Sequence, residues 1–320
     1  MRLTLRAVLL AAVLVLVSAA PALAGNGGIA PVAPASPNAE AIRNIWWLIL
    51  GITLVIFVLV EATLVVFVVK YRRGRRPRTA EGAQVHGHTR TEIAWTIVPV
   101  LIVFAIIGFV FSELPNVTNA PAANAAQKVD IQVEGHQYYW LYRYPGGQIS
   151  IDTMAAPVGK VVNLTVNAAD VIHAWWIPAL GGQIDAIPGR TNHTWFQARS
   201  AGIYTGQCAQ LCGIYHAQMK ATVRVVSDAR YRAFLAAHQP GSLILAKETF
   251  VGVCSKCHGF EGKGGYGPPL QNRAFQLDDI TKLLKNGRGR MPAVGSDWTA
   301  AQIAGIVHYL RQTKGGASGG

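Results

Sequence analysis

The chain contains four cysteines, and they occur as two closely spaced pairs. The first pair, Cys208 and Cys212, is followed by His216 and Met219 in the run CAQLCGIYHAQM. The second pair lies in the run CSKCH, where a histidine follows directly. Thiolates, imidazoles and thioethers are soft or borderline ligands that suit copper and haem iron. Two such sets in one chain predict two redox centres between which electrons pass.

The first set has the spacing of a copper site. Three residues separate Cys208 from Cys212, so both sulfurs can face one metal centre, and His216 and Met219 follow on the same loop. His173, in DVIHAWWIP, is the candidate for a ligand from a neighbouring strand, because it follows an extended run and has apolar neighbours that exclude water. Zinc is the chemical alternative, but methionine is a poor zinc ligand and zinc has no redox role.

The second set has the spacing of a covalent haem site. In a CxxCH motif two cysteines attach haem through thioethers and the histidine binds the iron, which assigns Cys254, Cys257 and His258. A lone CxxC could instead be a redox dithiol or half of a zinc site. The adjacent histidine and an export signal favour haem. Met291 is the only methionine after the motif and is the candidate sixth ligand, with His308 as its competitor.

These residues must be positioned by a chain that also enters a membrane, because 51% of its residues are hydrophobic and only 14% are charged. Residues 1–24 have a basic start, an apolar core and the small-residue site Ala22-Leu23-Ala24, which predict a signal peptide. An uncleaved anchor is the alternative. Two apolar runs, at about 45–69 and 93–111, are long enough to span a bilayer.

The loop between the two spans is strongly basic. Only Glu81 opposes its cations, which are Lys70, Arg72, Arg73, Arg75, Arg76, Arg78 and Arg90. This asymmetry places the loop in the cytoplasm and both ends of the mature chain outside. It also explains the basic patch without a nucleic-acid partner.

The remaining chain divides by pattern. Short runs rich in Val, Ile, Tyr and Trp recur from 128 to 226, with Gly, Pro and Asn between them, and predict a β-sandwich or barrel. The segment from 243 to 313 has apolar residues at helical spacing, and the KGGASGG tail is of low complexity. We therefore expect a multidomain membrane protein, whose parts are a signal peptide (1–24), an N-terminal segment with two transmembrane helices (25–119), an all-β domain (120–228), a linker (229–242), an all-α domain (243–314) and a disordered tail (315–320).

Residues 40–226 resemble subunit II of haem–copper cytochrome c oxidases. The resemblance rests on the two-helix hairpin and on the motifs TEIAWTIVP, GHQYYWLYRYP, VIHAWWIP, DAIPGR and GQCAQLCGIYHAQM. Residues 243–314 resemble a class I cytochrome c domain, through CSKCH, GPPL, RMP and a closing helix with HYL. The resemblance implies a cupredoxin-like β domain and a cytochrome c domain fused to it.

The resemblance also implies roles for individual residues. In the binuclear copper centre called CuA, Cys208 and Cys212 would bridge two coppers, His173 and His216 would each bind one, and a further two ligands would be Met219 and the backbone oxygen of Gln210. In the haem c site, the Pro268 carbonyl would accept a hydrogen bond from His258.

Three further positions are singled out by the resemblance. The family usually has Glu where this chain has Gln210, and that carboxylate helps to bind a magnesium ion shared with subunit I, so the change removes a magnesium ligand. Tyr138 replaces a tryptophan through which electrons are proposed to enter. Glu92 matches a glutamate at the mouth of a proton path into subunit I, although on the residues alone it is equally an acid in the first turn of a helix.

The function that the resemblance implies is that of an oxidase subunit which passes electrons from haem c to CuA and on to subunit I. There oxygen would be reduced to water with proton translocation. The implied partners are subunit I, subunit III, a cytochrome donor and membrane lipid, in a bacterial plasma membrane with both redox domains on its outer face. Two alternatives remain: another copper reductase such as nitrous oxide reductase, and a membrane-anchored CuA and haem c carrier that serves a different reductase.

Overall fold

The computed structural model describes residues 31–71, 82, 84, 86–271 and 276–312. The predicted signal peptide, most of the basic loop and the predicted tail lie outside these residues. The described chain divides into two compact units. One unit is Glu40–Val117, and the other contains the remaining described residues.

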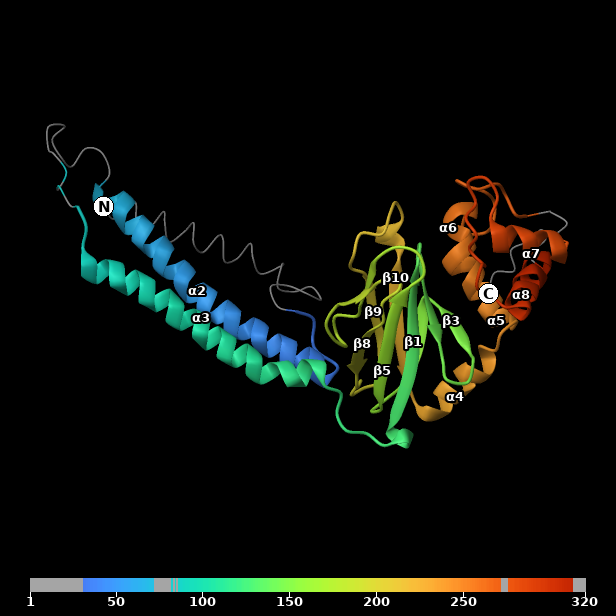
Figure 1. Ribbon diagram of the computed structural model, residues 1–320, viewed down its shortest axis with the longest axis horizontal. Helices are drawn as coiled ribbons and strands as arrows, with labels where there is room; N and C mark the ends of the chain where they lie inside the picture. The colour runs from blue at the N-terminus through green and yellow to red at the C-terminus, as the bar shows by residue number, and fades with distance from the viewer. Residues whose placement is uncertain (1–30, 72–81, 83, 85, 272–275, 313–320) are drawn as a thin grey trace, which may run out of the picture. The chain divides into compact units, whose positions relative to one another are not determined.

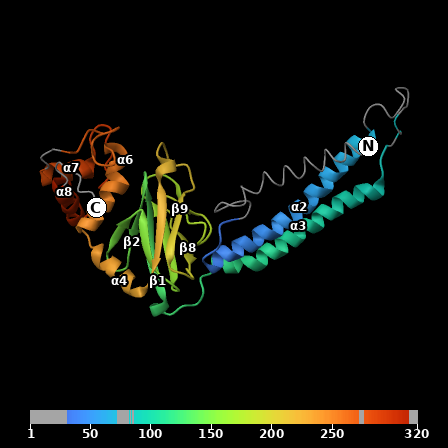
Figure 2. The same ribbon diagram turned by 180° about the vertical axis from the view of Figure 1, so that it is seen from behind.

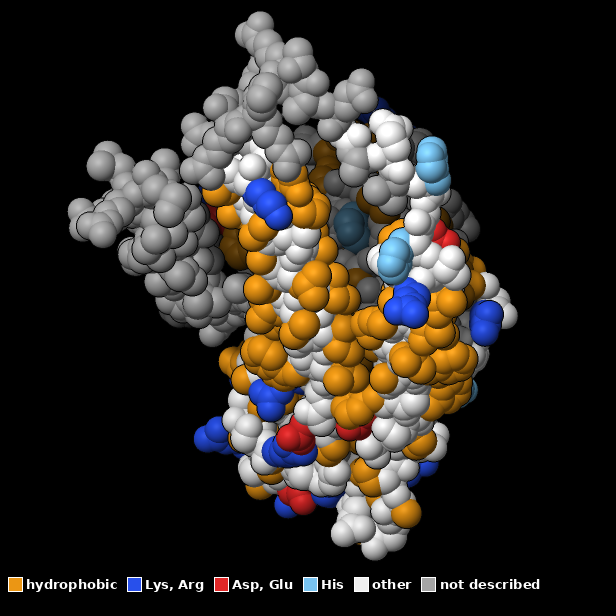
Figure 3. All heavy atoms as spheres, turned by 90° about the vertical axis from the view of Figure 1, so that its left-hand side faces the viewer, with side chains coloured by type: hydrophobic (Ala, Val, Ile, Leu, Met, Phe, Trp, Pro, Cys, Tyr) orange, Lys and Arg blue, Asp and Glu red, His pale blue; other side chains and the backbone are white. Residues whose placement is uncertain are grey.

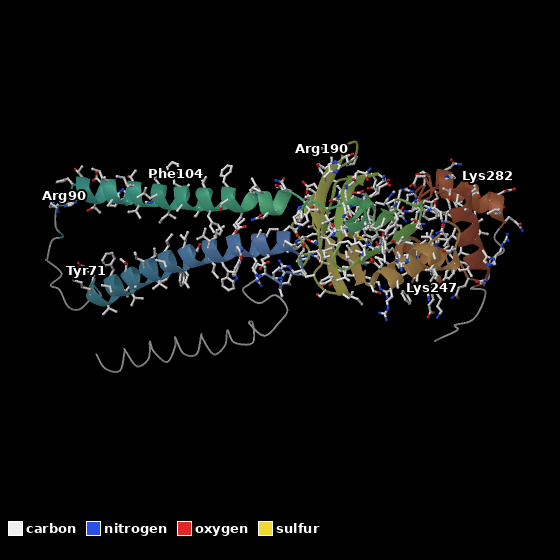
Figure 4. All side chains as sticks on the ribbon, turned by 90° about the horizontal axis from the view of Figure 1, so that it is seen from below. Tyr71, Arg90, Phe104, Arg190, Lys247 and Lys282 are labelled. Atoms are coloured by element: carbon white, nitrogen blue, oxygen red, sulfur yellow. The ribbon has the colours of Figure 1, made fainter. Side chains whose placement is uncertain are left out.

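The first unit is a pair of long helices, α2 (Pro37–Tyr71) and α3 (Thr89–Thr118), which run side by side in opposite directions (Figure 1). Tyr71 at the end of α2 and Arg90 at the start of α3 lie at the same end of the pair, and Phe104 projects outward (Figure 4). Apolar side chains cover the surface of the pair (Figure 3). Both helices are long and apolar enough to cross a bilayer. Both helices extend beyond the predicted spans at both ends.

The segment from Lys128 to Val226 forms the β domain, which confirms the all-β prediction. It has two five-stranded sheets, in the orders β3-β2-β1-β5-β8 and β4-β10-β9-β6-β7. The strands are β1 (Lys128–His136), β2 (Tyr139–Arg143), β3 (Ile149–Ile151), β4 (Thr153–Pro157), β5 (Val161–Ala168), β6 (His173–Trp176), β7 (Ile184–Ala186), β8 (Asn192–Phe196), β9 (Gly202–Cys208) and β10 (Lys220–Val226). Buried side chains of both sheets, such as Trp140, Leu164 and Phe196, form its core.

Helix α4 (Asp228–Ala237) leads out of the β domain. It occupies most of the segment expected to be a linker, and its Tyr231 and Phe234 pack on the β-domain core. The helical domain follows, with α5 (Leu243–Thr249), a π-helical turn (Phe250–Cys254), α6 (Ser255–His258), α7 (Leu277–Asn286) and α8 (Ala300–Gln312). The residues of α8 predicted to form its apolar face are buried, namely Ile303, Ile306, Val307 and Leu310.

Strand β2 joins the two domains because both of its faces are buried. Trp140 and Tyr142 point into the core of the β domain. Tyr139 and Leu141 belong to a second core, together with Ile149 and Ile151 of β3 and with residues of α5, α7 and α8. Figures 1 and 2 show β2 and β3 on the side of the sheet that faces the helical domain. In a sheet with one solvent-exposed face, each strand alternates polar and apolar residues. β2 does not, because the helical domain covers its outer face.

Leu141→Ala tests this second core. Leu141 is 0% exposed, so the truncation should lower the free energy of unfolding by ~2–5 kcal/mol. The melting temperature of the purified protein, followed through the absorbance of the haem region, should fall by several degrees. Ile203→Ala is the control, since Ile203 is 68% exposed on β9, and should change stability by no more than about 0.5 kcal/mol. Equal melting temperatures for the two variants would contradict a shared core.

Candidate redox sites

The structure brings the five side chains of the first predicted ligand set together at one end of the β domain. The Cys208 Sγ and Cys212 Sγ atoms are 3.9 Å apart. Each sulfur has one imidazole beside it: Cys208 Sγ lies 3.9 Å from His173 Nδ1, and Cys212 Sγ lies 3.5 Å from His216 Nδ1. The Met219 sulfur is 3.9 Å from Cys212 Sγ. The arrangement is a pair of sulfurs flanked by two imidazoles.

Strand pairing places these side chains. His173 begins β6 and Cys208 ends β9, and the two strands are paired through Trp175 and Cys208. The loop 208–219 is closed at its base, where the Cys208 amide donates to the Met219 carbonyl at 2.9 Å. His173 and Met219 are both 0% exposed. Only His216, in the short turn His216–Gln218, is partly open to solvent.

The pKa values of the two thiols shift in opposite directions. Burial raises the pKa of the Cys208 thiol, but hydrogen bonds with His173 and with the backbone outweigh it and lower that pKa to about 6. Burial and the neighbouring Cys208 raise the pKa of the Cys212 thiol to about 12. Two adjacent thiolates repel each other, so both ionise together only when a positive charge lies between them. The donor set therefore fits copper, with soft sulfur and imidazole ligands.

The backbone at Gln210 faces the same cluster. Its carbonyl oxygen is 3.2 Å from Cys208 Sγ, whereas its side chain is exposed. The main-chain position thus suits the role that the resemblance implies, and it does not depend on the Gln210 side chain.

Asp170 is a residue of this site that sequence reasoning missed. Its Oδ1 atom is 2.8 Å from His173 Nε2, so it fixes the ring with Nδ1 turned toward Cys208. A carboxylate on the far nitrogen of a histidine ligand sets its tautomer and orientation. The only sequence signal is the spacing of three residues between Asp170 and His173, which is too common to identify such a pair.

Tyr138 lies directly against the loop 208–219. Its ring makes an edge contact with Tyr215, with the centroids 5.3 Å apart. Its hydroxyl fills the space that a Cβ atom at Gly213 would need, and Gly213 has a φ of +132°, so a glycine is required there for two reasons. Next to it, Gln137 Nε2 donates to the Cys212 carbonyl at 2.6 Å.

Glu92 lies in the other unit, at the start of α3. Its Oε1 atom accepts a hydrogen bond from the His88 amide at 3.0 Å. This contact caps the first turn of the helix, as the alternative interpretation of Glu92 expected.

The second ligand set lies in the helical domain. Cys254 ends the π-helical turn and Cys257 lies on α6, three residues later and on the same side of the helix. His258 is buried, and its Nδ1 atom donates to the Pro268 carbonyl at 2.7 Å. That hydrogen bond, which the resemblance implied, leaves Nε2 with a free lone pair for a metal.

Met291 and Cys254 both pack against the second core. A tight turn with two backbone hydrogen bonds between Arg288 and Met291 holds the methionine in place. The competing ligand His308 is exposed on α8 and lies 3.1 Å from the Gln312 side chain. Two free thiols, a histidine with its tautomer fixed and a methionine form a donor set that fits a covalently bound haem, and Cys254 and Met291 share one apolar cluster.

Models of known protein families match three parts of the chain. The family "Cytochrome C oxidase subunit II, transmembrane domain" matches residues 26–112, and "Cytochrome C oxidase subunit II, periplasmic domain" matches residues 148–226. The family "Cytochrome C oxidase, cbb3-type, subunit III" matches residues 245–310.

Curated relatives carry one name. A protein of Alkalihalophilus pseudofirmus called "Cytochrome c oxidase subunit 2" is 28% identical, with 91% of this chain and 92% of the relative covered. A protein of the same name from Cereibacter sphaeroides is 34% identical, with 69% of this chain and 83% of the relative covered.

The fold, the two donor sets and these matches define a membrane-anchored subunit of a haem–copper terminal oxidase. The chain belongs to the cytochrome c oxidase subunit 2 family and has a cytochrome c domain at its C-terminal side. Copper in the β domain and haem in the helical domain follow from these families. The periplasmic family that matches the β domain identifies it as an outer domain.

Solved structures are also similar to parts of the chain. The periplasmic domain of subunit II of the Bradyrhizobium japonicum oxidase is 38% identical and covers 37% of this chain and 96% of its own, with a TM-score of 0.35. A chain of a haem–copper terminal oxidase dimer is 18% identical and covers 55% of this chain and 97% of its own, with a TM-score of 0.27. The family assignment above rests on the sequence matches.

Asp170→Asn tests the geometry of the first site. The amide is nearly the same size but cannot hold His173 by a charged hydrogen bond, so copper affinity should fall by ~10–100-fold. Copper retained after dialysis against graded concentrations of chelator measures this fall. Asp130→Asn is the control, because Asp130 is an exposed carboxylate on β1. Equal retention in both variants would show that Asp170 has no part in the site.

Proposed function

We propose that this chain is the electron-accepting subunit of a haem–copper terminal oxidase in a bacterial plasma membrane. It passes electrons from a covalently bound haem c to a binuclear CuA centre and on to subunit I, where oxygen is reduced to water and protons are translocated. The observation that supports this most strongly is the presence of both donor sets in one packed unit, each with the ligands its cofactor needs. When bound, the haem and the coppers supply one-electron redox chemistry.

The residues of the chain have separate tasks in this proposal. Cys208 and Cys212 would hold the copper centre as thiolates, and His173 and His216 would supply imidazole ligands to it. The weaker ligands are Met219 and the carbonyl of Gln210. The rigid loop 208–219 keeps these ligands in place when the charge of the site changes. Buried apolar neighbours exclude water from Cys208, Cys212 and Met219.

In the helical domain, Cys254 and Cys257 would hold the haem as thioethers, and His258 and Met291 would bind its iron. Tyr138 is proposed as an aromatic contact through which electrons reach the copper loop. Glu92 is proposed to lie at the mouth of a proton path into subunit I, in addition to capping α3.

Purification of the native complex tests the assignment as a whole. The purified complex should contain this chain together with subunit I, and its optical spectrum should show a-type haem. Metal and haem analysis should give two coppers and one c-type haem per copy of this chain. If the protein purifies alone and carries both centres, it is a carrier for another reductase instead.

The packed domains predict how transfer within the chain responds to salt. Salt screens exposed charges and acts weakly on buried contacts, and the second core holds the two domains together through apolar contacts. Electron transfer from haem to copper, measured by flash photolysis in the intact oxidase, should therefore be nearly independent of ionic strength. Reduction of the haem by a soluble charged donor serves as the salt-sensitive comparison. A steep fall of the internal rate with added salt would contradict the prediction.

Met291→Leu tests the sixth haem ligand. Methionine with histidine ligation raises the reduction potential of a haem, so its loss should lower the midpoint potential and abolish the methionine–iron charge-transfer band. Met219→Leu is the matched control, since it should alter the copper EPR spectrum and leave the haem potential unchanged. An unchanged haem potential in Met291→Leu would assign the ligand elsewhere.

A further inference from the structure

The haem-attachment segment lies directly on the β domain. A Cβ atom added at Gly252 would be 2.5 Å from Ile151 Cγ2 and 2.9 Å from Asp152 Oδ2. Only a glycine therefore allows the π-helical turn to approach β3 this closely. The contact places the CSKCH motif beside the residues that connect β1 to β2 and β3 to β4.

Lys256, between the two cysteines of that motif, makes a polar contact across this boundary. Its Nζ atom donates a hydrogen bond to the Tyr138 carbonyl and lies 3.6 Å from Asp152 Oδ2. The side chain is only 12% exposed. A buried ammonium group is costly unless it is paired and hydrogen-bonded, so these two contacts fix where the group can lie.

The segment that receives Lys256 is also bonded to the copper site. Gln137 donates from its side chain to the Cys212 carbonyl at 2.6 Å. The backbone amide of Gln137 donates to Asp170 Oδ2 at 2.6 Å, and Asp170 orients His173. Gln137 and Tyr138 are neighbours in the chain. Two consecutive residues thus contact the haem-attachment motif on one side and, on the other, Cys212 directly and His173 through Asp170.

The other contacts between the domains do not define this position as closely. The second core is apolar, and burial of apolar surface stabilises without strong directional preference. Arg143 Nη2 forms an ion pair with Asp297 Oδ2 at 2.8 Å and lies 3.4 Å from Glu134 Oε2. This pair is partly exposed. A further contact, from the Ile151 amide to Glu248 Oε2 at 3.2 Å, holds α5 and not the haem-attachment motif.

We propose that Lys256 is a positioning residue that fastens the haem-attachment motif to the Gln137–Tyr138 backbone and thereby sets the separation between haem c and the copper site. This inference rests on the proposed function. Electron transfer between fixed centres slows steeply as their separation grows and as bonded contacts between them are replaced by gaps. The route from Lys256 through Tyr138 and Gln137 to Cys212 consists of covalent bonds and two hydrogen bonds.

Lys256→Met in the intact oxidase is the test, because methionine keeps much of the length of the side chain and removes the ammonium group. The internal transfer from haem to copper should slow several-fold, because loss of the ammonium group removes the hydrogen bond to Tyr138 and lets the haem-attachment motif move away from the copper site. Haem reduction by an external donor and the copper EPR spectrum should stay unchanged. Lys256→Arg keeps the charge and the donors and should restore most of the rate.

Lys263→Met is the matched control, since Lys263 follows the CSKCH motif closely in the chain and its side chain is 69% exposed. It should transfer electrons at the wild-type rate. The haem midpoint potential is measured in every variant so that a change in driving force is separated from a change in position. A double-mutant cycle combines Lys256→Met with Gln137→Met. If both residues serve one route, the double variant is no slower than the slower single variant.

Hydrogen–deuterium exchange supplies a readout that does not depend on turnover. Lys256→Met should speed exchange in peptides that cover 137–142 and 250–258, and Lys263→Met should not. A wild-type internal rate in Lys256→Met, or equal slowing in Lys263→Met, would overturn the inference and leave the proposed function standing. Absence of internal transfer in the wild-type oxidase would instead overturn the proposed function.

Discussion

The burial of β2 on both faces is the constraint on which the rest of the outer unit depends. Tyr139 and Leu141 lie in the second core, while Trp140 and Tyr142 lie in the first, so neither core is complete without this strand. The helical domain therefore does not hang from the β domain by a flexible connector. Helix α4 packs along the β domain as well, through Tyr231 and Phe234. A change that loosens one core is transmitted to the other, because the same backbone carries both sets of side chains.

For the proposed transfer from haem to copper, this packing means that the donor is docked on its acceptor and not merely tethered to it. A tethered donor reaches its acceptor through effective concentration, which for a short flexible linker is in the ~mM range. A docked donor needs no encounter, because its position is fixed before the electron arrives. The β domain can then be poor in acidic residues without loss, since no acidic patch has to attract the haem-bearing domain. Along 128–226 its acids are Asp130, Glu134, Asp152, Asp170 and Asp185. Four of them have structural partners instead: Asp130 pairs with Lys128, Glu134 with Arg143, Asp152 with Lys256 and Asp170 with His173.

The sequence could predict the ligand sets and the fold classes because these depend on short-range patterns. Cys208, Cys212, His216 and Met219 share one loop, and CSKCH is contiguous, so spacing alone groups these residues, whereas His173 and Met291 are distant along the chain. The contact between the domains could not be predicted in this way, because Lys256 and Tyr138 are separated by more than a hundred residues and neither type marks the other. One local signal was present. The run YYWLY in β2 lacks the alternation of a half-exposed strand, and a continuous apolar run indicates burial on both faces. It did not say which segment would cover the second face.

Gln210 shows how one residue can have its two parts assigned to different tasks. Its carbonyl points toward Cys208, 3.2 Å from the sulfur, and its side chain points into solvent. The exchange of a carboxylate for an amide therefore leaves the inward face of the loop as it was and removes a negative charge from the outward face. Leu211 and Ile214 on the same loop are each 79% exposed, and exposed apolar groups of this kind mark protein contacts. The outward face is thus neutral and apolar, which suits association with the other oxidase subunits. A magnesium ion at that boundary would have to take its carboxylates from another residue, because this loop offers none.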